Sequence, residues 1–154
     1  METRRHATAV VRPSRPEDFE GVVALLRAAD LPSAGVREHF SEFLVATGSG
    51  GLVGAAGIER YGTFGLLRSV VVAEDARGRG LGQLLTSRAL ERAGEQRLLA
   101  VYLLTTTSAA FFERFGFRRV TRAGVPTELY ASAELQGACP DSAIMMALDL
   151  APRA

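Results

Sequence analysis

The sequence contains no lysine, no asparagine and no tryptophan, so all 18 of its basic residues are arginines. The absence of lysine excludes a Schiff-base lysine and the lysine-bearing loop with which many nucleoside triphosphatases hold phosphate. A single cysteine, Cys139, cannot form a disulfide within the chain, which suits a reducing compartment. No apolar run reaches the roughly 20 residues that span a bilayer. We therefore expect a cytoplasmic protein without a membrane partner.

Charge and composition favour a globular domain and give no sign of a nucleic-acid partner. The formal net charge is only +1, so the chain has no strong attraction to nucleic acid. Hydrophobic residues make up 47% and charged residues 23% of the sequence, as in folded domains. No repeat or linker divides the chain, and we predict a single domain over residues 1–154. His6 and His39 belong to no cluster with metal-ligand spacing, and we expect no metal.

Apolar periodicity predicts an alternation of strands and helices. The expected strands cover residues 8–12, 43–47, 52–60, 64–72, 98–104, 117–121 and 144–150. The expected helices cover residues 16–29, 36–41, 81–93 and 109–115, and Ser132 is expected to cap a short turn. An antiparallel meander followed by strand–helix–strand units predicts an α/β (α+β) fold. We expect a mixed, mostly antiparallel sheet of about seven strands with helices on both faces.

Two helix ends carry specific signals. Ser14 is followed three positions later by Glu17, which matches a capping box and predicts that the first helix begins at Pro16. Gly94 follows the periodic residues of the helix expected over residues 81–93 and predicts its C-terminal end. Both signals depend on local sequence alone, without any packing partner.

The strongest sign of function lies in residues 70–85. The apolar run over residues 70–72 predicts a central strand that is buried on both faces. A short loop then leads into six residues that open a helix: Arg77, Gly78, Arg79, Gly80, Leu81 and Gly82. The free amides and positive dipole end of a helix bind phosphate, glycines let the backbone approach it closely, and arginines add charged donors.

Three phosphate-binding patterns compete for this turn. A dinucleotide turn requires Gly-x-Gly-x-x-Gly, but the third glycine, Gly82, falls one position early. A nucleoside-triphosphate loop requires a lysine, which the chain lacks. The third pattern, Arg-x-x-Gly-x-Gly, is matched by Arg77, Gly80 and Gly82.

Because this pattern follows an apolar strand, the turn resembles the acyl-CoA-binding motif of the GNAT N-acetyltransferase superfamily. Residues 111–117 (FFERFGF) resemble the second motif of that family, and the resemblance extends over residues 11–150. It implies a GNAT-like fold and an enzyme that moves an acetyl group from acetyl-CoA directly to a primary amine of a small molecule. A homodimer, common among relatives, is left open beside a monomer.

Three further segments resemble the GNAT proteins of the arsenic-resistance group. They are residues 66–69 (LLRS), 102–107 (YLLTTT) and 139–143 (CPDSA). This narrower resemblance implies an amino-acid-like arsenical or phosphinate as the acceptor, and a role in detoxification. An arginine could hold the anionic group of such an acceptor through its planar fork.

The family's pattern assigns roles to residues of this chain. The residues implied in binding acetyl-CoA are Val70, Val71, Val72, Arg77, Gly78, Arg79, Gly80, Leu81, Gly82, Thr105 and Phe112. The residues considered for the acceptor are Arg68, Ser69 and Tyr61. Backbone N–H groups of the strand would polarise the acyl carbonyl. Glu59 would take the proton from the amine, directly or through a water molecule.

The chain departs from the family's pattern at three positions. Phe112 stands where the family often has the tyrosine that protonates the leaving thiolate. Thr105 stands where it often has asparagine, and Ser108 where it often has alanine. The proton would then come from Tyr102, from Ser108 or from a bound water molecule, or the thiolate would leave unassisted.

Other interpretations remain open from the sequence alone. Arg68 is interpreted either as a clamp for the acceptor or as the partner of Glu59 or another acid in a salt bridge. Cys139 is interpreted as a packed thiol, with an acyl relay or an arsenical ligand as the alternatives. Because the tyrosine is missing, a sensor that binds acyl-CoA without catalysis is the alternative to an enzyme.

Overall fold

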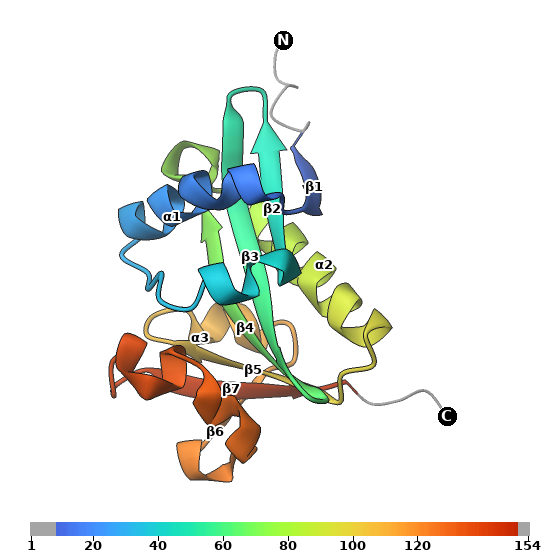
Figure 1. Ribbon diagram of the computed structural model, residues 1–154, viewed down its shortest axis with the longest axis vertical. Helices are drawn as coiled ribbons and strands as arrows, with labels where there is room; N and C mark the ends of the chain where they lie inside the picture. Colours follow the sequence, from blue (N-terminus) through green and yellow to red (C-terminus); the bar gives the residue numbers. More distant parts are fainter. Residues whose placement is uncertain (1–8, 151–154) are drawn as a thin grey trace.

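The computed structural model describes residues 9–150, in which seven strands form one sheet (Figure 1). The strands are β1 (Val10–Pro13), β2 (Phe43–Gly48), β3 (Gly51–Tyr61), β4 (Phe64–Val72), β5 (Ala100–Thr105), β6 (Arg118–Val120) and β7 (Ile144–Asp149). Their order in the sheet is β1-β2-β3-β4-β5-β7-β6, and among these described strands only β4 and β5 pair in parallel. The predicted mixed, mostly antiparallel sheet is therefore confirmed.

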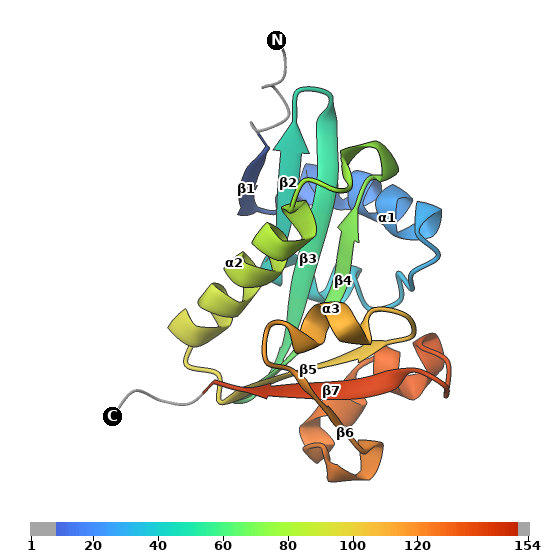
Figure 2. The same cartoon turned by 180° about the vertical axis from the view of Figure 1, so that it is seen from behind.

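Helices cover both faces of the sheet, and each face has its own core. The helices are α1 (Phe19–Ala28), α2 (Leu81–Glu95) and α3 (Ala109–Glu113). α1 and the 3-10 segment Arg37–Glu42 lie on one face, and α2 and α3 lie on the other (Figures 1 and 2). Side chains alternate along the strands, so Val45 and Ala55 pack in the core with α1, while Leu44 and Ala56 pack with α2.

The beginning of α1 differs from the predicted capping box. The hydroxyl of Ser14 donates to the carbonyl of Phe40 at 2.6 Å. The carboxylate of Asp18 instead accepts the backbone N–H of Arg15 at 2.7 Å. Residues Pro16–Asp18 form a 3-10 turn, so the regular helix begins later than predicted. The predicted pair of Ser14 and Glu17 is wrong, because the carboxylate of Asp18, one position after Glu17, accepts the free backbone N–H of Arg15 instead.

The end of α2 also differs from the prediction. Gly94 lies inside the helix, which continues to Glu95. The left-handed conformation that often follows a helix is adopted by Arg97, with a φ of 63°. The N–H of Arg97 donates to the carbonyl of Gly94 at 3.0 Å. Residue 8 of the first predicted strand lies outside the described residues.

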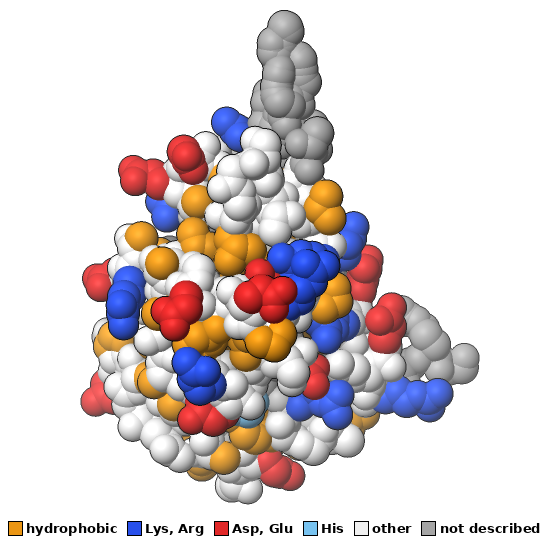
Figure 3. Space-filling view, turned by 45° about the horizontal axis from the view of Figure 1, so that its top comes forward, with side chains coloured by type: hydrophobic (Ala, Val, Ile, Leu, Met, Phe, Trp, Pro, Cys, Tyr) orange, Lys and Arg blue, Asp and Glu red, His pale blue; other side chains and the backbone are white. Residues whose placement is uncertain are grey.

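The surface carries charges of both signs. On the face shown in Figure 3, acidic and basic side chains are interspersed. Within residues 9–150, none of the helices combines the length and the apolar character needed to cross a bilayer. The same part of the chain holds no group of three or more His, Cys, Asp or Glu side chains arranged to bind a metal ion.

Candidate active site

β4 and β5 separate part-way along their length and open a gap in the sheet (Figure 2). They pair at three positions, from Phe64 with Ala100 to Leu66 with Tyr102, and the pairing ends there. The diverging parts of both strands line a cavity with a volume of about 1030 Å³. An extended ligand can hydrogen-bond to strand backbone in such a gap as an added strand would.

One end of the cavity is formed by the start of α2. Gly78 and Gly80 have φ values of 83° and 80°, which glycine adopts at little cost. The first hydrogen bond of the helix runs from the N–H of Leu84 to the carbonyl of Gly80, at 3.0 Å. The amides of residues 81–83 precede that bond, and no described side chain caps this end. Free amides at the positive end of a helix make this part of the cavity suitable for an anion such as a pyrophosphate.

Most of the residues predicted to hold acetyl-CoA line this cavity. They are Val70, Val72, Arg77, Gly78, Gly80, Leu81, Gly82, Thr105 and Phe112. The structure does not bring Val71 or Arg79 into it. Val71 lies on the face of β4 opposite to Val70 and Val72, in the core with α1. The side chain of Arg79 is exposed to solvent. The binding roles of the lining residues remain predictions.

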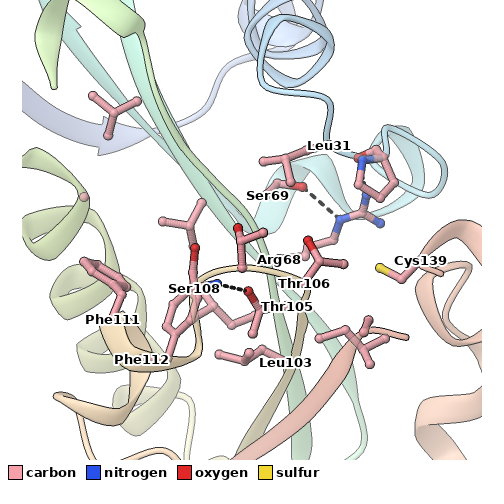
Figure 4. A pocket seen from close by; sticks show the side chains of 18 of the residues that line it. Leu31, Arg68, Ser69, Leu103, Thr105, Thr106, Ser108, Phe111, Phe112 and Cys139 are labelled. Carbon is pink, nitrogen blue, oxygen red and sulfur yellow. Dashed lines mark hydrogen bonds between the residues drawn. The ribbon is translucent and has the colours of Figure 1, made fainter. Parts of the chain in front are cut away.

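The side of the cavity away from the glycines is polar and buried. Figure 4 shows Arg68, Ser69 and Cys139 on this side, with Phe111 and Phe112 across the cavity from them. A polar wall therefore faces an apolar one. This arrangement suits a ligand that has both an alkyl chain and a polar reacting group.

A bulge in β4 directs Arg68 and Ser69 toward the cavity. The pairing of β3 with β4 shifts register between Ala55 and Gly57, and Ser69 has a φ of 61°. A positive φ is unfavourable for serine, and here the Ser69 hydroxyl accepts the Nε–H of Arg68 at 2.9 Å. Both side chains line the cavity as a result.

The guanidinium of Arg68 is engaged on several sides. Its Nη1 donates to the Oε2 of Glu59 at 2.7 Å and to the carbonyl of Ala34 at 2.6 Å. Its Nη2 donates to the carbonyl of Pro32 at 3.0 Å, and its Nε lies 3.4 Å from the Oε2 of Glu134. Arg68 therefore forms the expected salt bridge with Glu59, and its role as a clamp for the acceptor remains a prediction. The same side chain ties the loop of residues 29–36, the covering loop, to β4.

Glu59 lies deeper than the cavity wall. Its side chain is fully buried, and it is not one of the residues that line the cavity. Its Oε1 accepts the hydroxyl of Tyr61 at 2.5 Å and lies 3.9 Å from the Nε2 of His39. Burial and the Glu59 carboxylate raise the pKa of Tyr61, so this phenol stays protonated. The structure does not bring Glu59 or Tyr61 to the cavity, and their roles remain predictions.

Of the two side chains considered as donors to the thiolate, the structure brings Ser108 to the cavity but not Tyr102. Neighbouring residues of a strand point to opposite faces, and Tyr102 packs edge-on against Phe64 with ring centroids 6.3 Å apart. Ser108 precedes α3, and its backbone N–H donates to the Oγ1 of Thr105 at 3.0 Å. The alternation along β5 thus argues against Tyr102 as the donor.

Glu134, which no pattern in the sequence indicated, lines the cavity together with Cys139. Burial raises the pKa of the Glu134 carboxyl to about 7, although Arg68 opposes the shift. Burial and the neighbouring carboxylate raise the pKa of Cys139 to about 12, so the thiol is protonated at neutral pH and a poor nucleophile. Residues 125–143 show no apolar period, so no local signal could have placed Glu134 at the cavity.

Comparison with known proteins identifies the class to which this site belongs. Residues 39–119, more than half of the chain, match the acetyltransferase (GNAT) domain family, and the chain belongs to this family. The protein is therefore an acyl-CoA-dependent N-acetyltransferase. It is 29% identical over 125 residues to an uncharacterized N-acetyltransferase of Chlorobaculum tepidum, which covers 80% of this chain and 77% of that relative.

Solved structures share the fold. The N-acetylglutamate synthase of Neisseria gonorrhoeae, complexed with coenzyme A and N-acetyl-glutamate, matches with a TM-score of 0.80 at 19% identity. That match covers 94% of this chain but only 35% of the synthase, so this chain spans about a third of its length. Rv2747 of Mycobacterium tuberculosis, in complex with CoA and NLQ, matches with a TM-score of 0.76 at 23% identity, over 92% of this chain and 99% of that one.

Proposed function

We propose that this enzyme transfers the acetyl group of acetyl-CoA directly to the primary amine of a small molecule. The observation that carries the proposal is one cavity of about 1030 Å³, which joins the free amides of α2 to the buried cluster around Arg68. Pockets for small molecules usually measure roughly 300–1,000 Å³. A cavity of this size with two chemically different ends suits two substrates held at once, so the transfer requires no covalent enzyme intermediate.

In this proposal, acetyl-CoA lies along the gap between β4 and β5. The backbone of Val70 and Val72 bonds the pantetheine arm, and the amides of residues 78–82 hold the pyrophosphate. Arg77, whose Nε donates to the carbonyl of Val72 at 3.0 Å, adds positive charge beside it. The acetyl group then lies toward Arg68, where backbone N–H groups of the bulge polarise its carbonyl.

The segments that resemble the arsenic-resistance group meet at this cavity. Its lining includes Leu67, Arg68, Ser69, Leu103, Leu104, Thr105, Thr106, Thr107, Cys139, Pro140 and Ala143. These segments are far apart in the sequence, so their meeting supports an amino-acid-like arsenical or phosphinate as the acceptor, and hence detoxification. The anionic group of such an acceptor would bind Arg68 in exchange for one of the present partners of the guanidinium, with Ser69 beside it.

Departure of the CoA thiolate requires little help from an acid. An ordinary thiol has a pKa of about 8.5, so its thiolate is a good leaving group near neutral pH. Ser108 provides a hydroxyl at the cavity wall, whereas Phe112 provides no donor. The missing tyrosine is therefore compatible with turnover.

Release of free CoA thiol tests the proposal. The purified chain is mixed with acetyl-CoA and each member of a panel of primary amines that includes amino-acid-like arsenicals and phosphinates. We expect amine-dependent release of thiol with at least one small molecule, and an N-acetylated product in the mass spectrum. Binding of CoA without release by any amine would favour the sensor. Acetylation of protein N-termini alone would contradict a small-molecule acceptor.

A further inference from the structure

We infer that Glu134 is the carboxylate that binds the ammonium group of the acceptor and takes its proton, while Glu59 only positions Arg68. The inference rests on the proposed function, transfer to a small primary amine. An ammonium group has no lone pair, so it has to lose a proton before its nitrogen can attack the thioester. The protein therefore needs a basic group at the cavity wall.

Glu134 is fixed at that wall by its own turn. It begins the helical turn Glu134–Ala138, and its backbone N–H donates to the Oγ of Ser132 at 3.1 Å, which is the predicted cap. The residue is 4% exposed and lines the cavity. Its described side-chain partners are Arg68 and the thiol of Cys139. Because a carboxylate offers about four lone-pair positions, an ammonium group can join these partners.

Glu59 is placed for a different task. Both of its oxygens are engaged, Oε1 by Tyr61 at 2.5 Å and Oε2 by Arg68 at 2.7 Å. Its side chain is fully buried behind the guanidinium and does not line the cavity. Proton transfer requires hydrogen-bond reach or one bridging water, and Glu59 offers neither without displacing Arg68.

The charges of the cluster formed by Arg68, Glu59 and Glu134 favour the binding of a cation. In the described part of the chain, the carboxylates of Glu59 and Glu134 share the guanidinium of Arg68. When both acids are ionised, the buried cluster carries one excess negative charge, which is unfavourable unless a cation joins it. The ammonium group of an acceptor is such a cation. Asp30, an exposed acid that also lines the cavity, adds to the negative potential at its mouth.

The acidity of the cluster supports the same assignment. Burial raises the pKa of Glu134 to about 7, Arg68 lowers it, Glu59 raises it, and the hydrogen bond with Cys139 lowers it. On the far side of Glu59, Tyr61 and His39 are the titratable groups that lie against the Glu59 carboxylate. A base with a pKa near the working pH is partly ionised and still basic enough to take a proton.

The reaction balances with this single base. The ammonium gives one proton to Glu134, and the neutral nitrogen attacks the carbonyl carbon of acetyl-CoA. The C–S bond breaks, and sulfur leaves as the thiolate. The nitrogen then loses a second proton, which ends on the sulfur, and the products are the amide and CoA thiol. Glu134 returns its proton to solvent before the next turnover.

The test compares Glu134→Gln with Glu59→Gln and with the control Glu128→Gln, an exposed acid on the neighbouring turn Thr127–Ala131. The acceptor is the fastest amine from the thiol-release panel. Hydroxylamine, which is unprotonated at neutral pH, serves as the second acceptor. Rates are measured from about pH 6 to about pH 9, and calorimetric binding of CoA shows that each variant is folded.

We expect Glu134→Gln to lower kcat/KM for the amine by about 10²- to 10⁴-fold. The ionisation near neutral pH should also disappear from the pH dependence of kcat/KM. Hydroxylamine needs no base, so its rate should fall less than about tenfold. Glu59→Gln should keep the ionisation even where its rate falls, and Glu128→Gln should resemble the wild type. Glu134→Asp, which restores the carboxylate, should recover part of the loss.

Two results would overturn the assignment. One is a Glu134→Gln variant that retains both the ionisation and a rate within about tenfold of wild type. The other is loss of the ionisation in Glu59→Gln with its retention in Glu134→Gln, which would make Glu59 the base. Failure of the wild type with every amine is a distinct outcome, because it contradicts the proposed function and the role of Glu134 with it.

Discussion

The guanidinium of Arg68 lies 2.7 Å from the carboxylate of Glu59, and both side chains are fully buried. The pair connects two neighbouring strands at the bulge of β4, and the same guanidinium bonds the carbonyls of Pro32 and Ala34. One network thus fixes the bulge, the covering loop and a wall of the cavity. The acceptor side of the site is therefore formed before any ligand arrives, which lowers the entropic cost of positioning a substrate.

Removal of Arg68 should destabilise the fold strongly. In Arg68→Met, Glu59 is left as a buried charge without its partner, and we expect a loss of about 3–5 kcal/mol in the free energy of unfolding. Urea denaturation measures this loss. The control is Arg60→Met, because Arg60 lies 4.0 Å from Glu42 at the surface. That exposed pair should contribute less than about 1 kcal/mol, and equal effects of the two substitutions would contradict the account.

Thr86→Val should stabilise the protein. Thr86 lies on the buried face of α2, and its hydroxyl has no hydrogen-bond partner among residues 9–150. Valine has nearly the same shape and removes this unpaired group, so we expect a gain of about 1 kcal/mol in thermal or urea unfolding. Thr86→Ser keeps the hydroxyl and loses a methyl group, and it should destabilise. A gain with serine and a loss with valine would reverse the prediction.

Cys139 should react slowly with iodoacetamide in the folded protein. Its pKa is raised to about 12 by burial and by Glu134, whereas a free thiol has a pKa of about 8.5. The thiolate fraction near pH 8 is then about 10³-fold smaller, and alkylation should slow accordingly. Mass spectrometry follows the reaction, and protein unfolded in urea provides the fast control. Cys139→Ser should retain turnover, whereas rapid native labelling or an inactive serine variant would support a relay.

Glu134 should make stability depend on pH. Its pKa rises from 4.5 to about 7 on folding, so its contribution is fully present below pH 4.5 and is lost as the pH rises through 7. The unfolding free energy of wild type, relative to Glu134→Gln, should therefore fall by about 1–3 kcal/mol over this interval. Urea titrations of both proteins at each pH measure the difference. A difference that grows with pH would contradict a raised pKa.

The fold and one end of the site could be predicted from sequence because their signals are local. The apolar run over residues 70–72 and the glycines that follow it specify a buried strand, a turn and the start of α2 without reference to other segments. Ser132 was likewise recognisable as a cap. The end of α2 was predicted wrongly at Gly94, because the residue that adopts the positive φ after the helix is Arg97. Arginine rarely adopts a positive φ, so the sequence gives no signal for a helix end at this position.

The other end of the site could not be predicted because it depends on packing between distant segments. The partners of Arg68 come from residues 32, 34, 59 and 134, and no spacing in the sequence connects them. Tyr102 was considered as a donor because Phe112 stands where the family often has a tyrosine. The side of β5 on which it lies became clear only from the register of the sheet.

The amides at the start of α2 are the part of the site on which CoA binding depends most directly, and calorimetric titration with CoA tests them. At Gly82 an added Cβ would lie 3.8 Å from Phe111 and Val72, at the cavity wall, whereas at Gly94 in the same helix it would meet nothing within 4 Å. Leucine favours a helix more than glycine does, so both Gly82→Leu and the matched control Gly94→Leu should fold. We predict that wild type and Gly94→Leu bind CoA equally, and that Gly82→Leu binds it at least about tenfold more weakly, a loss of about 1.4 kcal/mol. Failure of the wild type to bind CoA, or undiminished binding by Gly82→Leu, would contradict the central claim.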